Sequence, residues 1–530
     1  MTLNWFIFDG IPKWLLERLL NTGELPYFKK IIDSGSFFDT KPSYPNCQTP
    51  AAMATLLTGQ SQQEHKINGY WMQGKEDHRK YVNSLLQASP EGSLIWEDLS
   101  KENIEIDLIQ IPWYKETSKK INFVGGINNR ISREKYYDLS NRDILNIEDE
   151  VGIIKAIKKD AFTWQLESNN YFTCINDKKW TLFTSNKGHS AWYRVVNSNE
   201  KEYLIRTAVW EMVYSSTRND SILLNKTIGK NPFLGETLGG MYRTGLFGKQ
   251  FYIDGDGTAE NLYLDLYKLS FEYYKLVLNE IFKNRSENKL RIIYVPFTDD
   301  IGHELIGFLN SDIEIPKKYE MKAFELLLKV YKYADQLLEI AYEEEKDFDF
   351  VISSDHGMNG VSTMFHPNDL LVCNGYAQKP SGDFENTNEK TSHVIYHVVN
   401  NGFIYENTKN HDNKILKAAL TKLIDYRHPI SKKKMVKELV DINGEKVNLQ
   451  TFNDKKCYIV FAENVMPNPE LTKNLSIISK PNRSATHHTY NSDKLNGIFI
   501  SSFKLKESSI KSNTEVKSII LKKMRGKNCQ

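Results

Sequence analysis

Short, largely apolar runs alternate along this chain with longer stretches of helical period. Residues 3–8, 291–297 and 348–354 are apolar enough to form strands that are buried on both faces. Helical patterns occupy residues 12–20 and 318–343, among others. This alternation predicts an α/β fold, a three-layer α/β/α sandwich around a mostly parallel sheet. In such sheets ligands bind beyond the carboxyl ends of the strands, so the residues at those ends are the first functional candidates.

Two stretches interrupt the alternation. Residues 114–257 are rich in Asn, Lys, Ser and aromatic residues and contain short strand-like runs, which we interpret as an inserted cap. Residues 405–474 form a second, smaller and polar insertion. The remaining segments, 1–113 and 258–530, are then expected to form one discontinuous α/β domain.

Composition excludes several classes of function. The chain has 69 Lys and Arg against 67 Asp and Glu, a net charge of +2, so we expect no nucleic-acid polymer as a partner. No apolar stretch is long enough to span a bilayer, and the first residues lack the basic region of a signal peptide. The five cysteines are scattered without CxxC spacing, which fits a reducing compartment. We therefore expect a cytoplasmic protein with no membrane partner.

Carboxylates and imidazoles follow the predicted strands. The aspartates follow predicted strands, and the histidines lie near them in the sequence or just before a late strand at 497–501. The residues are Asp9, Asp299, Asp300, His303, Asp355, His356, His487 and His488. Carboxylates crowded at one sheet edge repel each other unless a cation neutralises them. Mixed Asp and His donors suit zinc or manganese.

Each of these residues alone has a simpler interpretation. A single Asp after a strand is more often a helix N-cap or an Asx-turn than a metal ligand. Independent caps have no reason to recur with histidine partners, however. The set as a whole therefore favours a metal site.

A second signal is the segment from Gln48 to Gly59. Thr49 is a natural N-cap and Pro50 a natural first helical residue, followed by a run of Ala and Leu. A hydroxyl at a helix N-terminus lies where backbone N–H groups favour an anion, which suits a nucleophile that attacks phosphorus. A plain capping role for Thr49 is the alternative.

Taken together, these segments resemble the alkaline phosphatase superfamily, and in particular the type I phosphodiesterase and nucleotide pyrophosphatase group or its phosphohydrolase and phosphomutase relatives. The resemblance covers about residues 1–75 and 290–525. The matching segments stand in the family order: Phe8-Asp9-Gly10, the Thr49 helix, His65 to Tyr70, Asp299 to His303, Ser354 to Met358, and Ala485 to His487.

The resemblance implies an alkaline phosphatase-like catalytic domain with two divalent metal ions, usually Zn²⁺, with Mn²⁺ as the alternative. Asp299, His303 and His487 would hold one ion, and Asp9, Asp355 and His356 would hold the other, together with the Thr49 hydroxyl. Thr49 would attack the phosphorus of a small-molecule phosphate ester and form a covalent phospho-threonine that water then hydrolyses. The implied activity is that of a phosphodiesterase or pyrophosphatase.

Some positions depart from the family pattern or offer a choice. The family's phosphate-contacting Asn lies five residues after His65, where this chain has Tyr70, which becomes the candidate substrate contact. Asp299 is preferred to Asp300 because its four-residue spacing to His303 matches the pattern. His487 is preferred to His488 because it fits the last motif.

Other functions of the same fold remain as alternatives. A phosphomonoesterase or a phosphotransferase or phosphomutase would use the same residues, since a phospho-threonine can pass its group to an alcohol. A sulfatase needs Cys or Ser as the nucleophile with Arg four residues later, whereas this chain has Thr49 and Met53. A non-catalytic binding protein would have a broken ligand set, whereas each ligand position here holds a competent donor.

Overall fold

The computed structural model describes most of the chain. The described residues are 1–73, 81–102, 104–115, 120–126, 129–169, 171–198, 200–215, 234, 238–283, 288–309, 317–380, 387, 391–397, 402–407, 413–506 and 510–526. No helix in these ranges is both long enough and apolar enough to cross a membrane.

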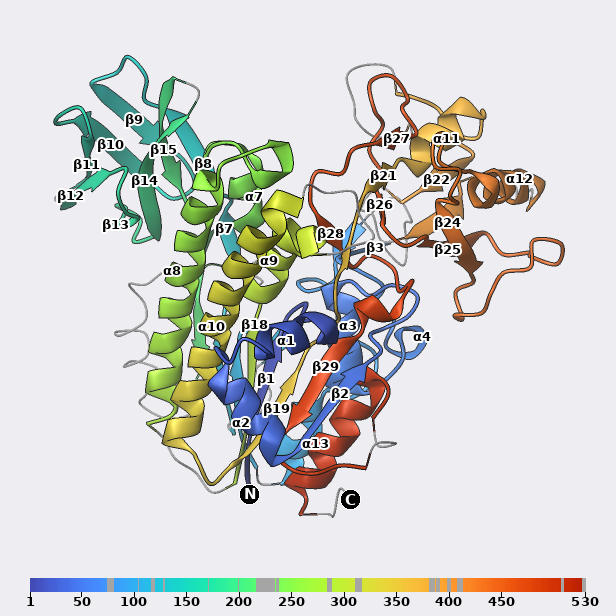
Figure 1. Cartoon of the computed structure of the whole chain (residues 1–530), viewed down its shortest axis with the longest axis horizontal. Coiled ribbons are helices and arrows are strands. Elements are labelled where there is room, and N and C mark those ends of the chain that lie inside the picture. The colour runs from blue at the N-terminus through green and yellow to red at the C-terminus, as the bar shows by residue number, and fades with distance from the viewer. Residues whose placement is uncertain are drawn as a thin grey trace.

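A mostly parallel sheet of eight strands forms the centre of the molecule (Figure 1). Its order is β17-β6-β5-β18-β1-β19-β29-β2, with parallel pairing from β6 through β19 and antiparallel pairing at β17, β29 and β2. The bounds are β1 Thr2–Phe8, β2 Ser36–Thr40, β5 Glu105–Ile109, β6 Ile121–Gly125, β17 Val213–Ser215, β18 Lys289–Val295, β19 Asp349–Ser353 and β29 Gly497–Ser501. Every residue of β1 is buried, as the apolar run at 3–8 predicts.

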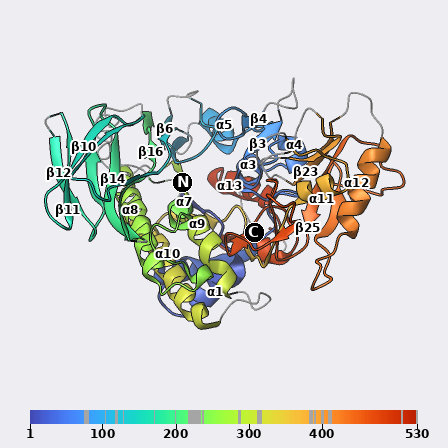
Figure 2. The same ribbon diagram turned by 90° about the horizontal axis from the view of Figure 1, so that it is seen from above.

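Helices cover both faces of this sheet (Figure 2). On one side lie α1 Lys13–Leu20, α2 Pro26–Ser34, α8 Thr258–Ile281, α9 Phe297–Leu305 and α10 Glu320–Glu344. On the other lie α3 Thr49–Thr58, α5 Ile95–Leu99 and α13 Val516–Met524. Apolar side chains from the strands and from both helix layers form one continuous core. The predicted three-layer α/β/α class is thereby confirmed.

A lobe of two antiparallel sheets occupies much of the range 114–257 (Figure 1). One sheet has the order β12-β11-β10-β9 and the other β13-β14-β15-β8, and they enclose a separate small core. The bounds are β8 Lys135–Asp138, β9 Ile144–Glu148, β10 Ile153–Lys158, β11 Thr163–Ser168, β12 Tyr171–Asn176, β13 Thr181–Thr184, β14 Ser190–Ser198 and β15 Lys201–Arg206. The same range also supplies β6 and β17 to the central sheet, so it contains more than a cap.

A second lobe lies on the opposite side of the molecule and has its own core (Figure 1). Its sheet has the order β22-β23-β25-β24 and packs with two helices. The bounds are α11 Pro367–Cys373, β22 Val394–Tyr396, β23 Phe403–Glu406, α12 Asn413–Asp425, β24 Val436–Val440 and β25 Lys456–Phe461. The lobe thus begins before residue 405. After this lobe, β27 (Ile478–Ser479) pairs with β21 (Thr363–Phe365) outside the central sheet.

Asp335 of α10 is expected to make the stability of the fold depend on pH. Its carboxylate accepts hydrogen bonds from the backbone N–H groups of Tyr27 (3.0 Å) and Phe28 (2.8 Å) at the start of α2. Burial raises the pKa of Asp335 to about 6, although these two hydrogen bonds act in the opposite direction. The folded state therefore holds this proton more tightly than the unfolded chain, and stability falls as pH rises through about 4 to 6.

Asp335→Asn removes this titration. Between pH 4 and pH 7 we expect the stability of Asp335→Asn relative to the wild type to rise by about 1–3 kcal/mol. Urea unfolding at several pH values measures this difference. Asp33→Asn, at an exposed position, is the control. A difference between Asp335→Asn and the wild type that is the same at both pH values would contradict the expectation.

Candidate active site

The predicted metal ligands converge beyond the carboxyl ends of the central strands. Asp9 follows β1, Asp299 lies in the first turn of α9 just after β18, and His356 follows β19. Because these three strands are neighbours in the sheet, residues that are far apart in the sequence meet at one edge. In each of two groups of residues, the possible ligand atoms all lie within 4.8 Å of one another. One group is Asp299, His356 and His487, and the other is Asp9, Asp355 and His356.

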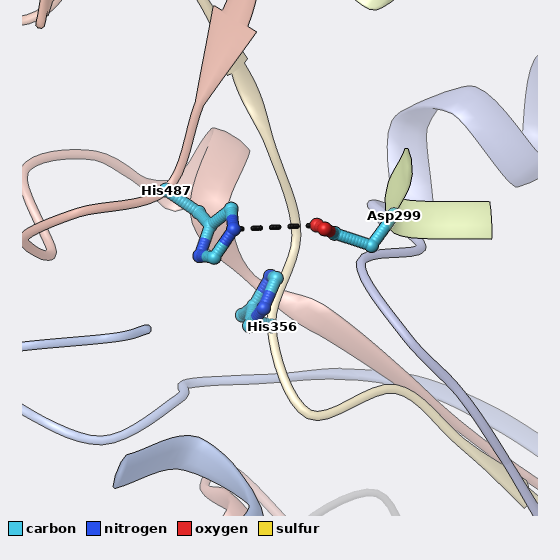
Figure 3. Close-up of side chains that lie close together, drawn as sticks. All are labelled: Asp299, His356 and His487. Atoms are coloured by element: carbon cyan, nitrogen blue, oxygen red, sulfur yellow. Dashed lines mark ion pairs between the residues drawn. The ribbon is translucent and has the colours of Figure 1, made fainter. Parts of the chain in front are cut away.

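The first predicted triad is held together around Asp299. Its Oδ2 lies 3.3 Å from Nε2 of His303, one helical turn later, and its Oδ1 lies 3.3 Å from Nε2 of His487. The two Nε2 atoms are 3.1 Å apart. Figure 3 shows His487 reaching Asp299 from the opposite side of the site.

The second predicted triad surrounds His356. Its Nε2 lies 3.2 Å from Oδ1 of Asp9 and 3.3 Å from Oδ2 of Asp355. The His356 ring also stacks on the His487 ring with centroids 3.7 Å apart, so the two triads adjoin each other. The structure therefore brings all six predicted ligands together.

The three imidazoles are oriented by backbone carbonyls. Nδ1 of His303 lies 2.9 Å from the carbonyl oxygen of Ala485, and Nδ1 of His356 lies 2.9 Å from that of Gly357. Nδ1 of His487 lies 3.4 Å from the carbonyl oxygen of Cys47. A carbonyl can only accept, so each Nδ1 carries the hydrogen, and Nε2 faces the carboxylates. Metal-binding histidines are commonly oriented by this kind of hydrogen bond.

Strong electrostatic effects act on the buried groups. Burial raises the pKa of Asp355 well above its ordinary value, and the neighbouring Asp9 adds to the effect. Burial alone would lower the pKa of His356, but Asp355 and Asp9 outweigh it and raise that pKa to about 10. Burial would also raise the pKa of Asp299, but His303 and His487 hold it far below its usual range.

Three carboxylate oxygens at the centre of the site have no hydrogen-bond donor among the described residues. They are Oδ1 of Asp9, Oδ1 of Asp299 and Oδ2 of Asp355, and all three are buried. A buried acceptor left without a donor costs about 1–3 kcal/mol, and more when it is charged. Divalent cations would satisfy these oxygens, so the residues present fit the metal centre that the resemblance implies.

Thr49 directs its hydroxyl at the second triad. Its Oγ1 lies 3.3 Å from Nε2 of His356 and 3.5 Å from Oδ2 of Asp9, and the residue is only 2% exposed. The prediction that Thr49 is the N-cap was wrong by one residue: α3 starts at Thr49 and its cap is Gln48. A residue already inside the helix has its side chain free for other contacts.

The loop before Thr49 is paired with the segment that carries His487. The backbone N–H of Cys47 donates to the carbonyl oxygen of His488 (3.2 Å), and Asn46 forms a β-bridge with Thr489. The Cys47 thiol donates to the carbonyl oxygen of His487 (2.7 Å). This pairing places the α3 N-terminus beside the metal ligands.

The structure also separates the sequence alternatives. Asp299, and not Asp300, lies against the histidines, while the carbonyl oxygen of Asp300 accepts a hydrogen bond from the Tyr263 hydroxyl (3.2 Å). His487 belongs to the cluster, whereas Nδ1 of His488 lies 3.0 Å from Nε2 of Gln48. The carbonyl oxygen of Tyr70 accepts hydrogen bonds from Ser84, and a role for Tyr70 in substrate binding stays a prediction.

Sequence reasoning missed the residues that support the ligands. The hydroxyl of Tyr294 donates to Oδ2 of Asp9, and Thr298 Oγ1 donates to the carbonyl oxygen of Asp9 (2.5 Å). Asn513, just before α13, donates through its side chain to the carbonyl oxygen of Asp355 (2.6 Å). The only signal for Tyr294 and Thr298 is that they stand next to a predicted strand end, and Asn513 has none.

Gly10 is expected to be required for the position of Asp299. Its φ is +66°, and a Cβ at this residue would lie 2.7 Å from Oδ1 of Asp299 and 2.9 Å from its Cβ. Gly10→Ala should therefore displace the carboxylate and weaken zinc affinity by at least about 10-fold. Competition with a chromophoric chelator measures this affinity.

Gly23→Ala is the matched control for this substitution. Gly23 has a similar φ of +76°, but nothing lies within 4 Å of a Cβ there. Both variants should lose thermal stability through the same backbone strain, of about 1–2 kcal/mol. Only Gly10→Ala should lose zinc affinity, and equal affinities in the two variants would contradict the steric argument.

Comparison with known proteins identifies the family. The model of the type I phosphodiesterase/nucleotide pyrophosphatase family matches residues 5–456. A search of curated proteins gives no significant match.

Two solved structures of low sequence identity are similar to this chain. Phosphonoacetate hydrolase from Sinorhizobium meliloti 1021, in complex with phosphonoformate, has a TM-score of 0.51 and 11% identity over 97% of this chain and 93% of its own. Murine ectonucleotide pyrophosphatase/phosphodiesterase 5 has a TM-score of 0.47 and 12% identity over 100% of this chain and 96% of its own.

The family match spans most of the chain and includes both the Thr49 helix and the strand ends that carry five of the six metal-ligand candidates. The phosphonoacetate hydrolase structure, with its TM-score of 0.51, shares the fold of this chain. The chain therefore belongs to the type I phosphodiesterase/nucleotide pyrophosphatase family of metal-dependent enzymes, and it is a phosphoric ester hydrolase.

Proposed function

We propose that this enzyme cleaves phosphodiester or pyrophosphate bonds in small-molecule substrates, with Thr49 as the nucleophile and two divalent metal ions as cofactors. The observation that carries the proposal is the position of the Thr49 hydroxyl. It lies at a helix N-terminus, buried, and within 3.3–3.5 Å of His356 and Asp9.

The two triads divide the ligands between the ions. Asp299, His303 and His487 would hold one ion, and Asp9, Asp355 and His356 would hold the other next to Thr49. Bound there, the cations would supply Lewis acidity and offset the negative charge of the phosphate ester. The mixture of carboxylate and imidazole donors favours Zn²⁺, with Mn²⁺ as the alternative.

Thr49 and its helix carry the chemical step. Oγ1 of Thr49 attacks phosphorus and loses its proton to solvent, and the phosphorus–oxygen bond to the leaving group breaks with its electron pair staying on the leaving oxygen. The N-terminus of α3 would bring the positive end of the helix dipole to the phosphoryl oxygens of a substrate attacked by Thr49. Water then attacks phosphorus, the bond to Oγ1 breaks, and Thr49 regains a proton.

A substrate panel tests the proposed function. The purified protein would be assayed with Zn²⁺ and with Mn²⁺ on bis-p-nitrophenyl phosphate, p-nitrophenyl phosphate, a dinucleotide pyrophosphate and p-nitrophenyl sulfate. We expect the diester or the pyrophosphate to give the highest kcat/KM and the sulfate the lowest. Faster turnover of the monoester would favour a phosphomonoesterase. No turnover of any phosphate compound by the metal-loaded protein would contradict the proposal.

Location is a separate question. The cytoplasmic location expected from the sequence stays a prediction. Fractionation of the source cells tests it, and recovery of the protein outside the cytoplasm would contradict it.

A further inference from the structure

Arg483 lies beside the candidate active site, and the part of the chain that the structure describes offers it no hydrogen-bonded or ion-paired partner. Its Nε–H group is buried, and no acceptor among the described residues lies in hydrogen-bonding geometry to it. Within the described ranges, no salt bridge joins its guanidinium to a carboxylate. Arginine is rarely buried without a paired anion, because the loss of hydration is costly.

The backbone around Arg483 is fixed against the first metal triad. The N–H of the next residue, Ser484, donates to the carbonyl oxygen of His303 (2.9 Å), and the Ser484 hydroxyl approaches the same oxygen (3.3 Å). The carbonyl oxygen of Ala485 orients the His303 ring (2.9 Å). Arg483 therefore directly precedes the residues that position a metal ligand, and it stands four residues before His487.

No described carboxylate near Arg483 forms an ion pair with it. Glu304 of α9 is already paired with Arg243, the last residue of α7 (Leu238–Arg243). Asp299 belongs to the first metal triad. Burial lowers the pKa of Arg483, and the nearby Arg243 lowers it further. The charges of Glu304, Asp299 and Asp300 act in the opposite direction.

We propose that Arg483 binds a second anionic group of the substrate, a carboxylate or a phosphate outside the phosphoryl group that is transferred. The proposal rests on the proposed function, since it gives that active site a specificity-determining residue. A guanidinium presents parallel N–H donors that match the oxygens of a carboxylate or phosphate. In a partly buried position such a charged contact changes affinity by about 10- to 100-fold.

Three matched diesters with the same chromophore test this role. They are ethyl, carboxymethyl and 2-phosphonooxyethyl 4-nitrophenyl phosphate, which differ in the second anionic group. The wild type should prefer one of the anionic diesters, and which one it prefers distinguishes a carboxylate site from a phosphate site. Arg483→Gln should raise KM for that diester by about 10- to 100-fold and leave kcat and the ethyl diester nearly unchanged.

Two further variants separate charge from structure. Arg483→Lys keeps the charge and should retain part of the preference. Lys480→Gln removes a charge from an exposed side chain of the same segment, which donates to the carbonyl oxygen of Tyr252 (3.4 Å), and it should retain all of the preference. Equal losses on the ethyl and the anionic diesters in Arg483→Gln would overturn the proposal, because Arg483 would then serve the transferred phosphoryl group or the fold.

A binding measurement makes the test independent of turnover. Metal-loaded Thr49→Ala protein would be titrated calorimetrically with phosphonoacetate, inorganic pyrophosphate and ethylphosphonate. We expect phosphonoacetate or pyrophosphate to bind about 10- to 100-fold more tightly than ethylphosphonate, and this preference to disappear when Arg483→Gln is added. If the wild type hydrolyses no ester, the proposed function fails while this titration still tests Arg483. Equal affinities for all three ligands would overturn the proposal.

Discussion

Replacing Thr49 with alanine is expected to lower kcat by about 10⁴-fold or more without unfolding the protein. The substitution removes the hydroxyl that lies 3.3 Å from His356 and 3.5 Å from Asp9. Alanine is a good helix former, so α3 should persist. Steady-state kinetics on the best phosphate substrate measures the loss, and circular dichroism monitors the fold.

Two companion variants sharpen this result. Thr49→Ser keeps a hydroxyl at the same position and should retain far more activity than Thr49→Ala. Thr58→Ala, at the other end of the same helix, removes a hydroxyl that donates to the carbonyl oxygen of Ala54 (2.6 Å) and should leave kcat nearly unchanged. Acid quenching during turnover should trap a phosphate on the Thr49 peptide in the wild type. Full activity in Thr49→Ala would show that another group is the nucleophile.

The second large effect is expected from Asp355→Asn, which should cost one of the two proposed metal ions and lower activity by about 10³-fold. Oδ1 of Asp355 accepts from the backbone N–H groups of His356 (3.0 Å) and Gly10 (3.3 Å), contacts that an asparagine oxygen can keep. The substitution therefore removes the charge with little change of shape. Elemental analysis of gel-filtered protein should show the fall in metal content.

Thermal unfolding gives this prediction a readout besides activity. With EDTA present, Asp355→Asn should unfold at the same temperature as the wild type or higher, because burial and Asp9 both disfavour the charged Asp355 carboxylate. With Zn²⁺ present it should unfold at a lower temperature than the wild type, because less metal stabilises the folded state.

Asp300→Asn is the control for metal content. It changes the carboxylate next to Asp299 and should keep the full complement of metal. EDTA should abolish wild-type activity, and Zn²⁺ should restore it. Activity that persists after exhaustive chelation would contradict the metal-dependent mechanism.

Much of the central fold could be predicted from local sequence. The apolar run at 3–8 became β1, and the helical pattern at 318–343 corresponds to α10, Glu320–Glu344. Strands buried on both faces and helices with one apolar face have strong periodic signals. By contrast, β6 and β17 are short, and their place in the central sheet depends on pairing with β5 and with each other.

The supporting contacts of the site could not be predicted in this way. Tyr294 contacts Asp9 from β18, and its place near a predicted strand end is its only signal. Asn513 contacts Asp355 from the segment before α13, and nothing in its local sequence marks it. The start of α3 was misplaced by one residue for a related reason. Threonine is a common N-cap residue, so the local sequence favours a capping role for Thr49. Only the tertiary contacts show that Thr49 lies inside the helix and faces the second triad.

The sequence by itself determined which chemical groups this protein can bring to a reaction: four aspartates beside strand ends, histidines at fitting intervals, and a threonine before a helix of small residues. The tertiary structure alone decided which of them meet. Asp299 faces the histidines while Asp300 does not, because successive helical residues point in different directions. His487 reaches the site because the segment that carries it, through His488 and Thr489, pairs with the loop before Thr49. Donor chemistry belongs to single residues, whereas distances between donors arise from packing across the whole chain.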